Sequence, residues 1–346
     1  MAFRFVRKQR GRINLALQGG GAHGAFTWGV LDYLLEHGAL DIEGISGTSA
    51  GAMNAVAVAH GFMENSYDGA RETLSLFWGR VASSSPFKMA SRTSDDSLLV
   101  SPALTLMMSF THYFSPYQLN PLELNPLRDI VTSLYDFDKL AHQSPIKLFI
   151  ATTHANSGHL RLFQTHEINA DVLMASACLP ALHHSVEMDG EPYWDGGYSA
   201  NPAIFPLYYH CQSPDILLIL LTPAILGSNP ITADEIKTRA MDIAFNAAFL
   251  REMRSIDEAR QFATRTWLPK GPLERNLLRL RFHMISPDER MHAMPSATRM
   301  VADRDFLHLL RDMGREQAQN WLQQHRRRIG RESSLDIGQL FRCHPA

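Results

Sequence analysis

The sequence predicts an α/β fold built on a mostly parallel sheet with helices on both faces. Two consecutive units carry this prediction, and each consists of a short apolar strand, a glycine turn and a helix. In the first unit, the apolar run 13–17 ends in the glycine-rich stretch 19–24, and residues 25–36 repeat apolar side chains at helical spacing. In the second unit, the run 42–46 is followed by a helix of small residues over 50–60. Parallel strands need such helical crossovers, which cover both faces of the sheet.

The remaining elements follow from further apolar runs and turn residues. Asp189-Gly190 lies between two short strand-like runs, 185–188 and 193–195, which is a strong signal for a two-residue hairpin. Other strands are predicted over 146–153, 159–164, 215–221 and 278–285. Helices are predicted over 66–81, 121–135, 170–178, 233–263 and 296–325.

Composition and charge are those of a globular protein. Apolar residues make up 45% and charged residues 20% of the 346 residues, so the chain can bury a substantial core. Because 33 basic residues balance 35 acidic ones, the net charge of −2 does not favour a nucleic-acid partner. Cys178, Cys211 and Cys343 have neither a paired pattern nor the spacing of metal ligands. We therefore expect no nucleic acid, no metal and no cofactor.

Two observations predict a cytoplasmic protein. The first twelve residues carry five cations, but no long apolar run follows them, so we expect no secretory signal peptide. No uncharged stretch reaches the roughly 20 residues that span a bilayer. The basic start and the arginine cluster 326–328 can contact anionic lipid at a membrane surface, although solvated basic ends are the simpler interpretation.

No internal repeat or low-complexity linker divides the chain. We therefore expect a single domain over 1–346 with its core at 13–221. Residues 83–116 stand apart, because they mix Ser, Pro and charges with many apolar side chains. A segment of this kind is typical of a cover over an active site, and a buried helix over 98–108 is an equally good interpretation. Helices within 223–330 are expected to form a C-terminal extension.

The first motif that carries chemistry is the stretch 19–24, with the sequence Gly-Gly-Gly-Ala-His-Gly, which follows a strand and opens a helix. Backbone amides at such a helix start attract negative charge. They can bind the pyrophosphate of a dinucleotide, for which G-x-G-x-x-G is the spacing, or stabilise the oxyanion of an attacked ester. A tight turn without a ligand is a third interpretation, and the motif alone does not decide among the three.

The second motif, Gly47-Thr48-Ser49-Ala50-Gly51, favours ester chemistry. It has the pattern G-x-S-x-G between a predicted strand and a predicted helix, where a sharp turn holds the serine hydroxyl clear of the backbone. A dinucleotide site would want an acidic residue at the end of this strand, whereas Asp41 and Glu43 lie at its start. We therefore predict that Ser49 is a nucleophile, and a nucleotide-binding oxidoreductase is the weaker alternative.

A serine hydroxyl needs a base, and Asp195 is a candidate. Two glycines follow it directly after the hairpin strand, although a plain turn has the same sequence. Sixteen histidines are present, and His183 and His184 lie just before the hairpin, so a Ser-His-Asp triad stays open. A carboxylate that acts directly has an ordinary pKa of about 4, and burial beside Trp194 would raise that pKa toward the useful range.

The three motifs, in this order, resemble those of the patatin-like phospholipases. This family has a glycine-rich oxyanion loop, a G-x-S-x-G elbow and an Asp-Gly-Gly or Asp-Gly-Ala motif. The resemblance implies a three-layer α/β/α sandwich, a Ser–Asp dyad without a catalytic histidine, and release of fatty acyl chains from phospholipids or related lipid esters. Carried over to this chain, the site residues are the nucleophile Ser49, the base Asp195 and the oxyanion-hole amides of Gly19, Gly20 and Gly21.

One position departs from the family pattern. The family usually has Arg or Lys two residues after the third glycine, and this chain has His23, whose positive charge is expected to be partial and pH-dependent. The expected function is that of a serine esterase of the phospholipase A type, with a lipid ester as its partner and with contact to a membrane surface. A lipid-binding or regulatory module without turnover is the alternative, and the sequence leaves the oligomeric state open.

Overall fold

The computed structural model describes residues 11–38, 40–84, 90–92, 98–101, 114–223, 229–265, 267 and 270–341. Of residues 90–92, 98–100 and Asp234 it describes the backbone alone. Most of the segment 83–116, for which we predicted a cover or a buried helix, lies outside the described residues. The described part of that segment includes two short paired strands, β3 (Ala90–Arg92) and β4 (Leu98–Val100).

An eight-stranded sheet lies at the centre of the molecule. Its strands are β1 (Gly11–Leu17), β2 (Leu40–Thr48), β5 (Lys147–His154), β6 (Leu160–Gln164), β7 (Val186–Met188), β8 (Glu191–Asp195), β9 (Asp215–Ile219) and β10 (Arg281–Ile285). The order is β10-β9-β1-β2-β5-β8-β7, and β6 pairs with β5 as well. The strands from β10 to β5 are parallel, whereas β6, β8 and β7 run antiparallel to their partners. The prediction of a mostly parallel sheet is confirmed.

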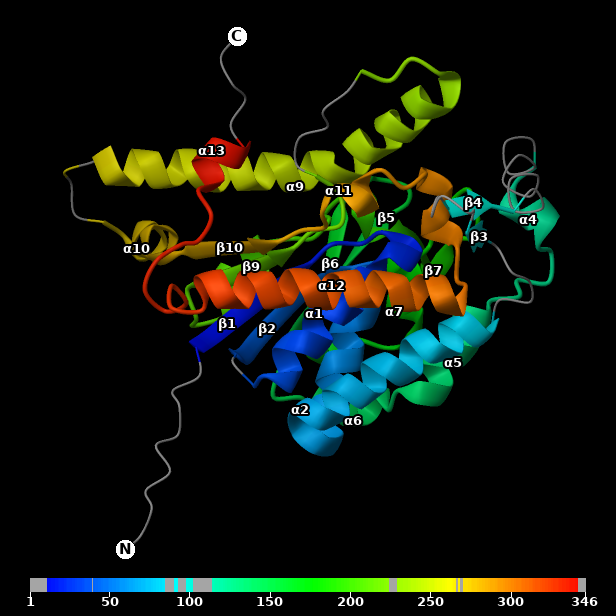
Figure 1. Cartoon of the computed structure of the whole chain (residues 1–346), viewed down its shortest axis with the longest axis horizontal. Helices are drawn as coiled ribbons and strands as arrows, with labels where there is room; N and C mark the ends of the chain where they lie inside the picture. The colour runs from blue at the N-terminus through cyan, green and yellow to red at the C-terminus, as the bar shows by residue number, and fades with distance from the viewer. Residues whose placement is uncertain are drawn as a thin grey trace, which may run out of the picture.

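Helices cover both faces of this sheet. They are α1 (Gly24–Glu36), α2 (Ala50–Ser84), α4 (Pro116–Leu119), α5 (Pro126–Leu134), α6 (Phe137–Gln143), α7 (Ala170–Ser176), α8 (Phe205–His210), α9 (Ala233–Arg265), α10 (Pro272–Arg279), α11 (Glu289–His292), α12 (Arg304–His325) and α13 (Ile337–Phe341). Short 3-10 turns are η1 (Gly21–His23), η2 (Thr165–Glu167), η3 (Gly196–Tyr198) and η4 (Ser296–Met300). Figure 1 shows the long helices α9 and α12 running across the view, with β9 and β10 between them.

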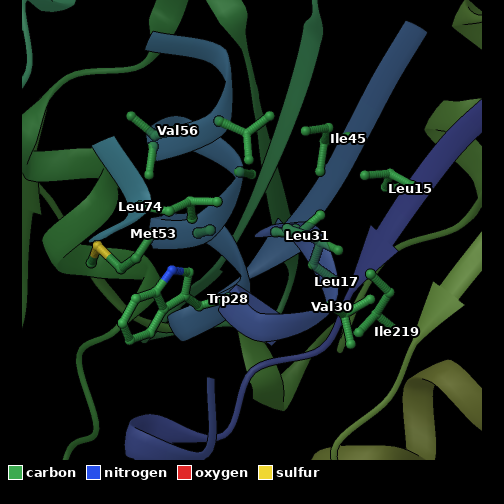
Figure 2. Packing of buried hydrophobic residues seen from close by; sticks show 14 of the residues in the cluster. Leu15, Leu17, Trp28, Val30, Leu31, Ile45, Met53, Val56, Leu74 and Ile219 are labelled. Atoms are coloured by element: carbon green, nitrogen blue, oxygen red, sulfur yellow. The ribbon is translucent and has the colours of Figure 1, made fainter. Parts of the chain in front are cut away.

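Alternating side chains of β1 explain the three layers. Leu15 and Leu17 point to one face, where they join a cluster that includes Trp28 of α1 and Met53 of α2 (Figure 2). Ala16 points to the other face, where it joins a cluster with α8, α9, α10 and α13. Because each fully buried leucine or isoleucine stabilises the fold by about 2 kcal/mol, the two clusters hold helices on both faces of the sheet.

The contact between α1 and α12 is unusually close because glycines form it. A Cβ atom at Gly29 would overlap the backbone carbonyl of Arg311, and a Cβ atom at Gly314 would overlap that of Phe26. Neither glycine has the positive φ that would demand glycine for backbone reasons. The small residues therefore serve helix packing, and α12 is part of the core although it lies far along the chain.

Four predicted helices differ from the observed ones in where they begin or in how they are joined. The helix predicted over 121–135 begins only at Pro126, because Asn125 caps it and proline suits its first turn. The helix predicted over 296–325 is interrupted after η4, and Asp303 caps the start of α12. The predicted helices 50–60 and 66–81 form the two arms of α2, which meet at a kink where Ser66 has a φ of 52°. Six shorter helices were not predicted: α4, α6, α8, α10, α11 and α13.

Among the described helices, none combines the length and the apolar character that crossing a bilayer requires. Cys178 and Cys211 are free thiols, and Cys343 lies outside the described residues.

Candidate active site

Ser49 lies on the sharp turn between β2 and α2. Its φ of 54° places a non-glycine residue in the left-handed region, which is a strained conformation. Close approach of the neighbouring backbone explains the flanking glycines, since a Cβ atom at Gly47 would lie 2.6 Å from the carbonyl oxygen of Gly51. The buried Ser176 hydroxyl accepts a hydrogen bond from the Ser49 amide at 2.9 Å. The turn is thus held in place while the Ser49 side chain faces a cavity.

The register of β5 brings Asp195 to Ser49. Thr48 at the end of β2 pairs with Ala151, and Asp195 at the end of β8 pairs with the next residue, Thr152. Strand β6 occupies the opposite edge of β5 over this stretch, so β2 and β8 lie on the same edge, one after the other. As a result the Ser49 hydroxyl lies beside the Asp195 carboxylate, whose pKa it lowers. The two predicted catalytic residues are therefore in contact.

Burial changes the acidity of Asp195. Its side chain is 1% exposed, and this desolvation raises the pKa of the carboxyl to about 7. Two neighbours oppose the rise, the Gly197 amide, which donates a hydrogen bond at 2.7 Å, and the Ser49 hydroxyl. A Cβ atom at Gly197 would overlap the ring of Phe245, so that ring from α9 packs directly against the turn after Asp195.

The glycine-rich loop lies next to Ser49. A Cβ atom at Gly19 would lie 2.8 Å from the Ser49 Cβ, and the Gly19 amide donates to the Asn201 side chain at 2.8 Å. Among the described residues, no acceptor binds the amides of Gly20 and Gly21. Of the three glycines predicted to form an oxyanion hole, these two have free donors and the first does not.

The expectation of a partly charged His23 is wrong. The ring is buried, and desolvation together with the nearby Arg299 guanidinium lowers its pKa to about 3, so it is neutral near pH 7. Its Nε2 lies 2.8 Å from the Thr298 hydroxyl, which itself donates to the Pro295 carbonyl. The hydroxyl must therefore accept from Nε2–H, and His23 anchors η4 to the loop instead of supplying charge.

The cavity in front of Ser49 is about 440 Å³ in volume and mostly apolar. Ser49, Asp195, the three loop glycines and Asn201 form its polar end. Apolar side chains from α2, α5, α9, η4 and the segment after α7 line most of the rest: Met53, Phe77, Trp78, Val81, Pro126, Leu127, Ile130, Leu179, Leu182, Met241, Phe245 and Met300. A pocket of this size and character suits an acyl chain.

Histidine does not join the Ser49–Asp195 pair within the described part of the chain. His183 lines the cavity, but no hydrogen bond joins its ring to either residue, and burial lowers its pKa. His184 stacks on Tyr117 and lies 3.2 Å from the Pro116 carbonyl oxygen. Nor do any three His, Cys, Asp or Glu side chains gather as metal ligands among the residues described.

Four residues of the site were missed by sequence reasoning: Ser176, Asn201, Phe245 and Arg299. None belongs to a recognisable motif, and three of them reach the site through tertiary packing of helices or 3-10 turns. Asn201 lies only six residues after Asp195, and this closeness in the chain was the one available signal.

Comparison with known proteins gives the chain a family. A family model described as patatin-like phospholipase matches residues 15–208, more than half of the chain. Two solved structures are similar at low identity. VipD from Legionella pneumophila is 17% identical with a TM-score of 0.45, and the match covers 92% of this chain and 67% of VipD. ExoU of Pseudomonas aeruginosa, in its complex with SpcU, is 15% identical with a TM-score of 0.34, and the match covers 96% of this chain and 58% of ExoU.

No curated protein sequence matches the chain. The span matched by the family model contains the glycine loop, the serine elbow and the Asp-Gly-Gly turn, which the fold brings to one cavity. The chain is a member of the patatin-like phospholipase family, and this membership supports a lipid hydrolase activity.

Proposed function

We propose that the chain hydrolyses carboxylic esters of phospholipids or related lipids through a Ser49–Asp195 dyad and an acyl-enzyme intermediate. The observation that carries the proposal is the contact of the Ser49 hydroxyl with a buried carboxyl whose pKa is raised to about 7. A base with a pKa near the working pH is the most effective, because it is both available and able to take a proton.

In the first step, the Asp195 carboxylate takes the Ser49 proton while Oγ attacks the ester carbonyl carbon. The amides of Gly20 and Gly21 are the donors proposed to stabilise the oxyanion, since they have no acceptor among the described residues. The tetrahedral intermediate then collapses, and the leaving alcohol takes the proton from Asp195. In the second step, Asp195 accepts a proton from water, and the resulting hydroxide attacks the acyl-enzyme. As this second tetrahedral intermediate collapses, Asp195 returns the proton to the Ser49 oxygen and the fatty acid leaves.

Contact with a membrane surface is part of this proposal. Leu122 and Leu124 are 79% and 69% exposed, and they lie just before Asn125 and Pro126, which line the cavity. Such exposed leucines next to an apolar cavity suit a lipid surface from which an acyl chain is withdrawn.

The test is hydrolysis of a p-nitrophenyl ester chain-length series by the wild type, Ser49→Ala, Asp195→Asn and His183→Gln, repeated in mixed micelles. We expect Ser49→Ala to lose at least about 10³-fold in kcat/KM and Asp195→Asn about 10²- to 10⁴-fold. His183→Gln is expected to retain turnover, because a Ser–Asp dyad does not need this ring. Activity in Asp195→Asn but not in His183→Gln would reject the dyad. Lipid binding without turnover in the wild type would favour a non-catalytic module.

A further inference from the structure

A second cavity, of about 250 Å³, adjoins the catalytic one. The two cavities share Leu221, Thr222, Asp242 and Arg299 in their walls. Their chemistry differs, because polar and charged side chains form most of the second cavity's wall, whereas the catalytic cavity is mainly apolar. A molecule with one long apolar part and one polar part could therefore occupy both at once.

Arg299 lies at the junction of the two cavities and is held there firmly. Its backbone carbonyl rests against Gly21, so that a Cβ atom at that glycine would overlap it. The preceding residue of η4, Thr298, binds the buried ring of His23. The Arg299 side chain reaches Asp242 of α9 through Nη1 at 2.6 Å. An arginine has five N–H donors, and within the described residues Asp242 accepts from one of them.

One of the two arginines in the wall of the second cavity has no carboxylate partner among the described residues. Besides Arg299, the wall has one more arginine, Arg239, and the carboxylates of Glu235 and Asp242. Glu235 accepts hydrogen bonds from the backbone amides of Ile231 and Thr232 and so caps the start of α9. Asp242 pairs with Arg299, whereas Arg239 meets no carboxylate in the part of the chain that the structure describes.

We propose that this second cavity binds the phosphodiester of a lipid substrate while its ester carbonyl lies at Ser49. The inference rests on the proposed function and narrows its substrate class to lipids with a phosphate next to the glycerol backbone. Arg299 meets the phosphate at the junction and Arg239 meets it from within the cavity. Guanidinium groups suit this task, because their planar donors match two phosphate oxygens at once.

Matched substrates test this selectivity. Phosphatidylcholine and diacylglycerol with the same acyl chains are presented in identical mixed micelles, and kcat/KM is measured for each. In Arg299→Gln and in Arg239→Gln we expect the phosphatidylcholine-to-diacylglycerol ratio to fall roughly 10- to 100-fold, the effect of losing a charged hydrogen bond. Phosphatidylglycerol should show the same fall, since it shares the phosphodiester. Arg251→Gln is the control, because this exposed arginine lies on the same helix outside both cavities.

Arg299→Gln breaks an ion pair with Asp242 and could change selectivity by disturbing the fold. Arg239→Gln does not have this drawback, because Arg239 has no ion pair in the described structure. An unchanged ratio in both variants, with folded protein by circular dichroism, would overturn the proposal while leaving the hydrolase intact.

A binding measurement separates the subsite from catalysis. Short-chain diether phosphatidylcholine, which has no ester to cleave, is titrated into the Ser49→Ala protein by calorimetry. We expect it to bind at least about 10-fold more tightly than the matching diether glycerol, and Arg299→Gln to remove the difference. If the wild type cleaves no ester but this preference holds, the proposed function fails and the subsite stands. Equal binding of both diethers would contradict the subsite.

Discussion

At the scale of single residues, the site depends on the surroundings of Asp195 as much as on its identity. A solvated aspartate is a weak base with a pKa near 4, whereas burial raises the pKa of this one to about 7. Part of that burial comes from Phe245, whose ring packs on Gly197 and lies 4.6 Å from the ring of Tyr198. The pKa of Asp195 therefore depends in part on a helix that carries none of the three motifs.

The first prediction concerns Phe245→Ala. Removing the ring admits water to Asp195 and lowers its pKa, so the acid limb of kcat/KM should move from about pH 7 down by about one unit. The direction follows because the base must be ionised to act, and a lower pKa extends the ionised range to lower pH. The measurement is a pH profile on a soluble ester, with Phe262→Ala, a 73% exposed position on the same helix, as control. A limb that stays in place would show that α9 does not set this pKa.

At the scale of elements, α12 is as much a part of the core as the strands are. Gly29 and Gly314 let α1 and α12 approach until backbone meets backbone, and Leu307, Leu310 and Leu322 of α12 join the cluster of Figure 2. This contact also positions η4, because α12 follows it after only three residues. A change in the packing of α12 should thus reach the cavity as well as the stability.

A methyl group at this contact tests its closeness. Gly314→Ala adds a Cβ where the Phe26 carbonyl lies, so we expect the free energy of unfolding to fall by about 1–3 kcal/mol. Gly79→Ala is the matched control, since its added Cβ meets open space in helix α2 and should stabilise by up to about 1 kcal/mol. Urea unfolding followed by circular dichroism measures both variants. Equal free energies of unfolding for the two variants would contradict the prediction, because α1 and α12 would then accommodate the added methyl group without a loss of stability.

At the scale of the whole molecule, a buried charge network ties the C-terminal segments to the sheet. Asp215 at the start of β9 accepts hydrogen bonds from Arg281 at 2.6 Å and from the Gly330 amide at 3.0 Å, and its Oδ1 lies 3.1 Å from His283 Nε2. These partners lower the pKa of Asp215 to about 2, although burial alone would raise it. The network lies at the end of β9 away from the cavity, so its role is to hold β10 and the segment around Gly330 against β9.

Replacing this carboxylate gives a pH-dependent loss of stability. The stabilisation by Asp215 is complete above its unfolded pKa of 3.8 and disappears as pH falls through about 2. Asp215→Asn should therefore lower the free energy of unfolding by about 2 kcal/mol at pH 7, and by less at pH 3. Urea titrations at both pH values measure the difference. Asp171→Asn, which breaks an exposed ion pair with Arg128, should cost less than about 1 kcal/mol. A difference for Asp215→Asn that is the same at both pH values would contradict the assigned pKa.

The parts of this site that could be predicted are those that follow from strand order. Ser49 and the glycine loop each follow a parallel strand, and the ends of such strands meet at one edge of the sheet. The hairpin that precedes Asp195 could be predicted because Asp-Gly is a common two-residue hairpin turn. Asp189 and Gly190 do adopt the positive φ values that such a turn requires. The break before α12 also had a local signal that we did not use, namely the capping aspartate Asp303.

The remaining parts depend on contacts between distant segments, which local patterns do not reveal. The neutral state of His23 results from its burial under η4, and the position of Arg299 results from the docking of η4 on Gly21. Phe245 is one of many apolar residues on α9, and only the packing of that helix singles it out. Sequence motifs thus identified the atoms expected to react, and tertiary packing determines their environment.

The docking of η4 on the glycine loop has a consequence for protein engineering. Two of the segments that line the catalytic cavity, α9 and η4, lie beyond residue 208, where the matched family region ends. Chimeras that exchange this C-terminal third between relatives would keep every motif and still alter the walls of both cavities.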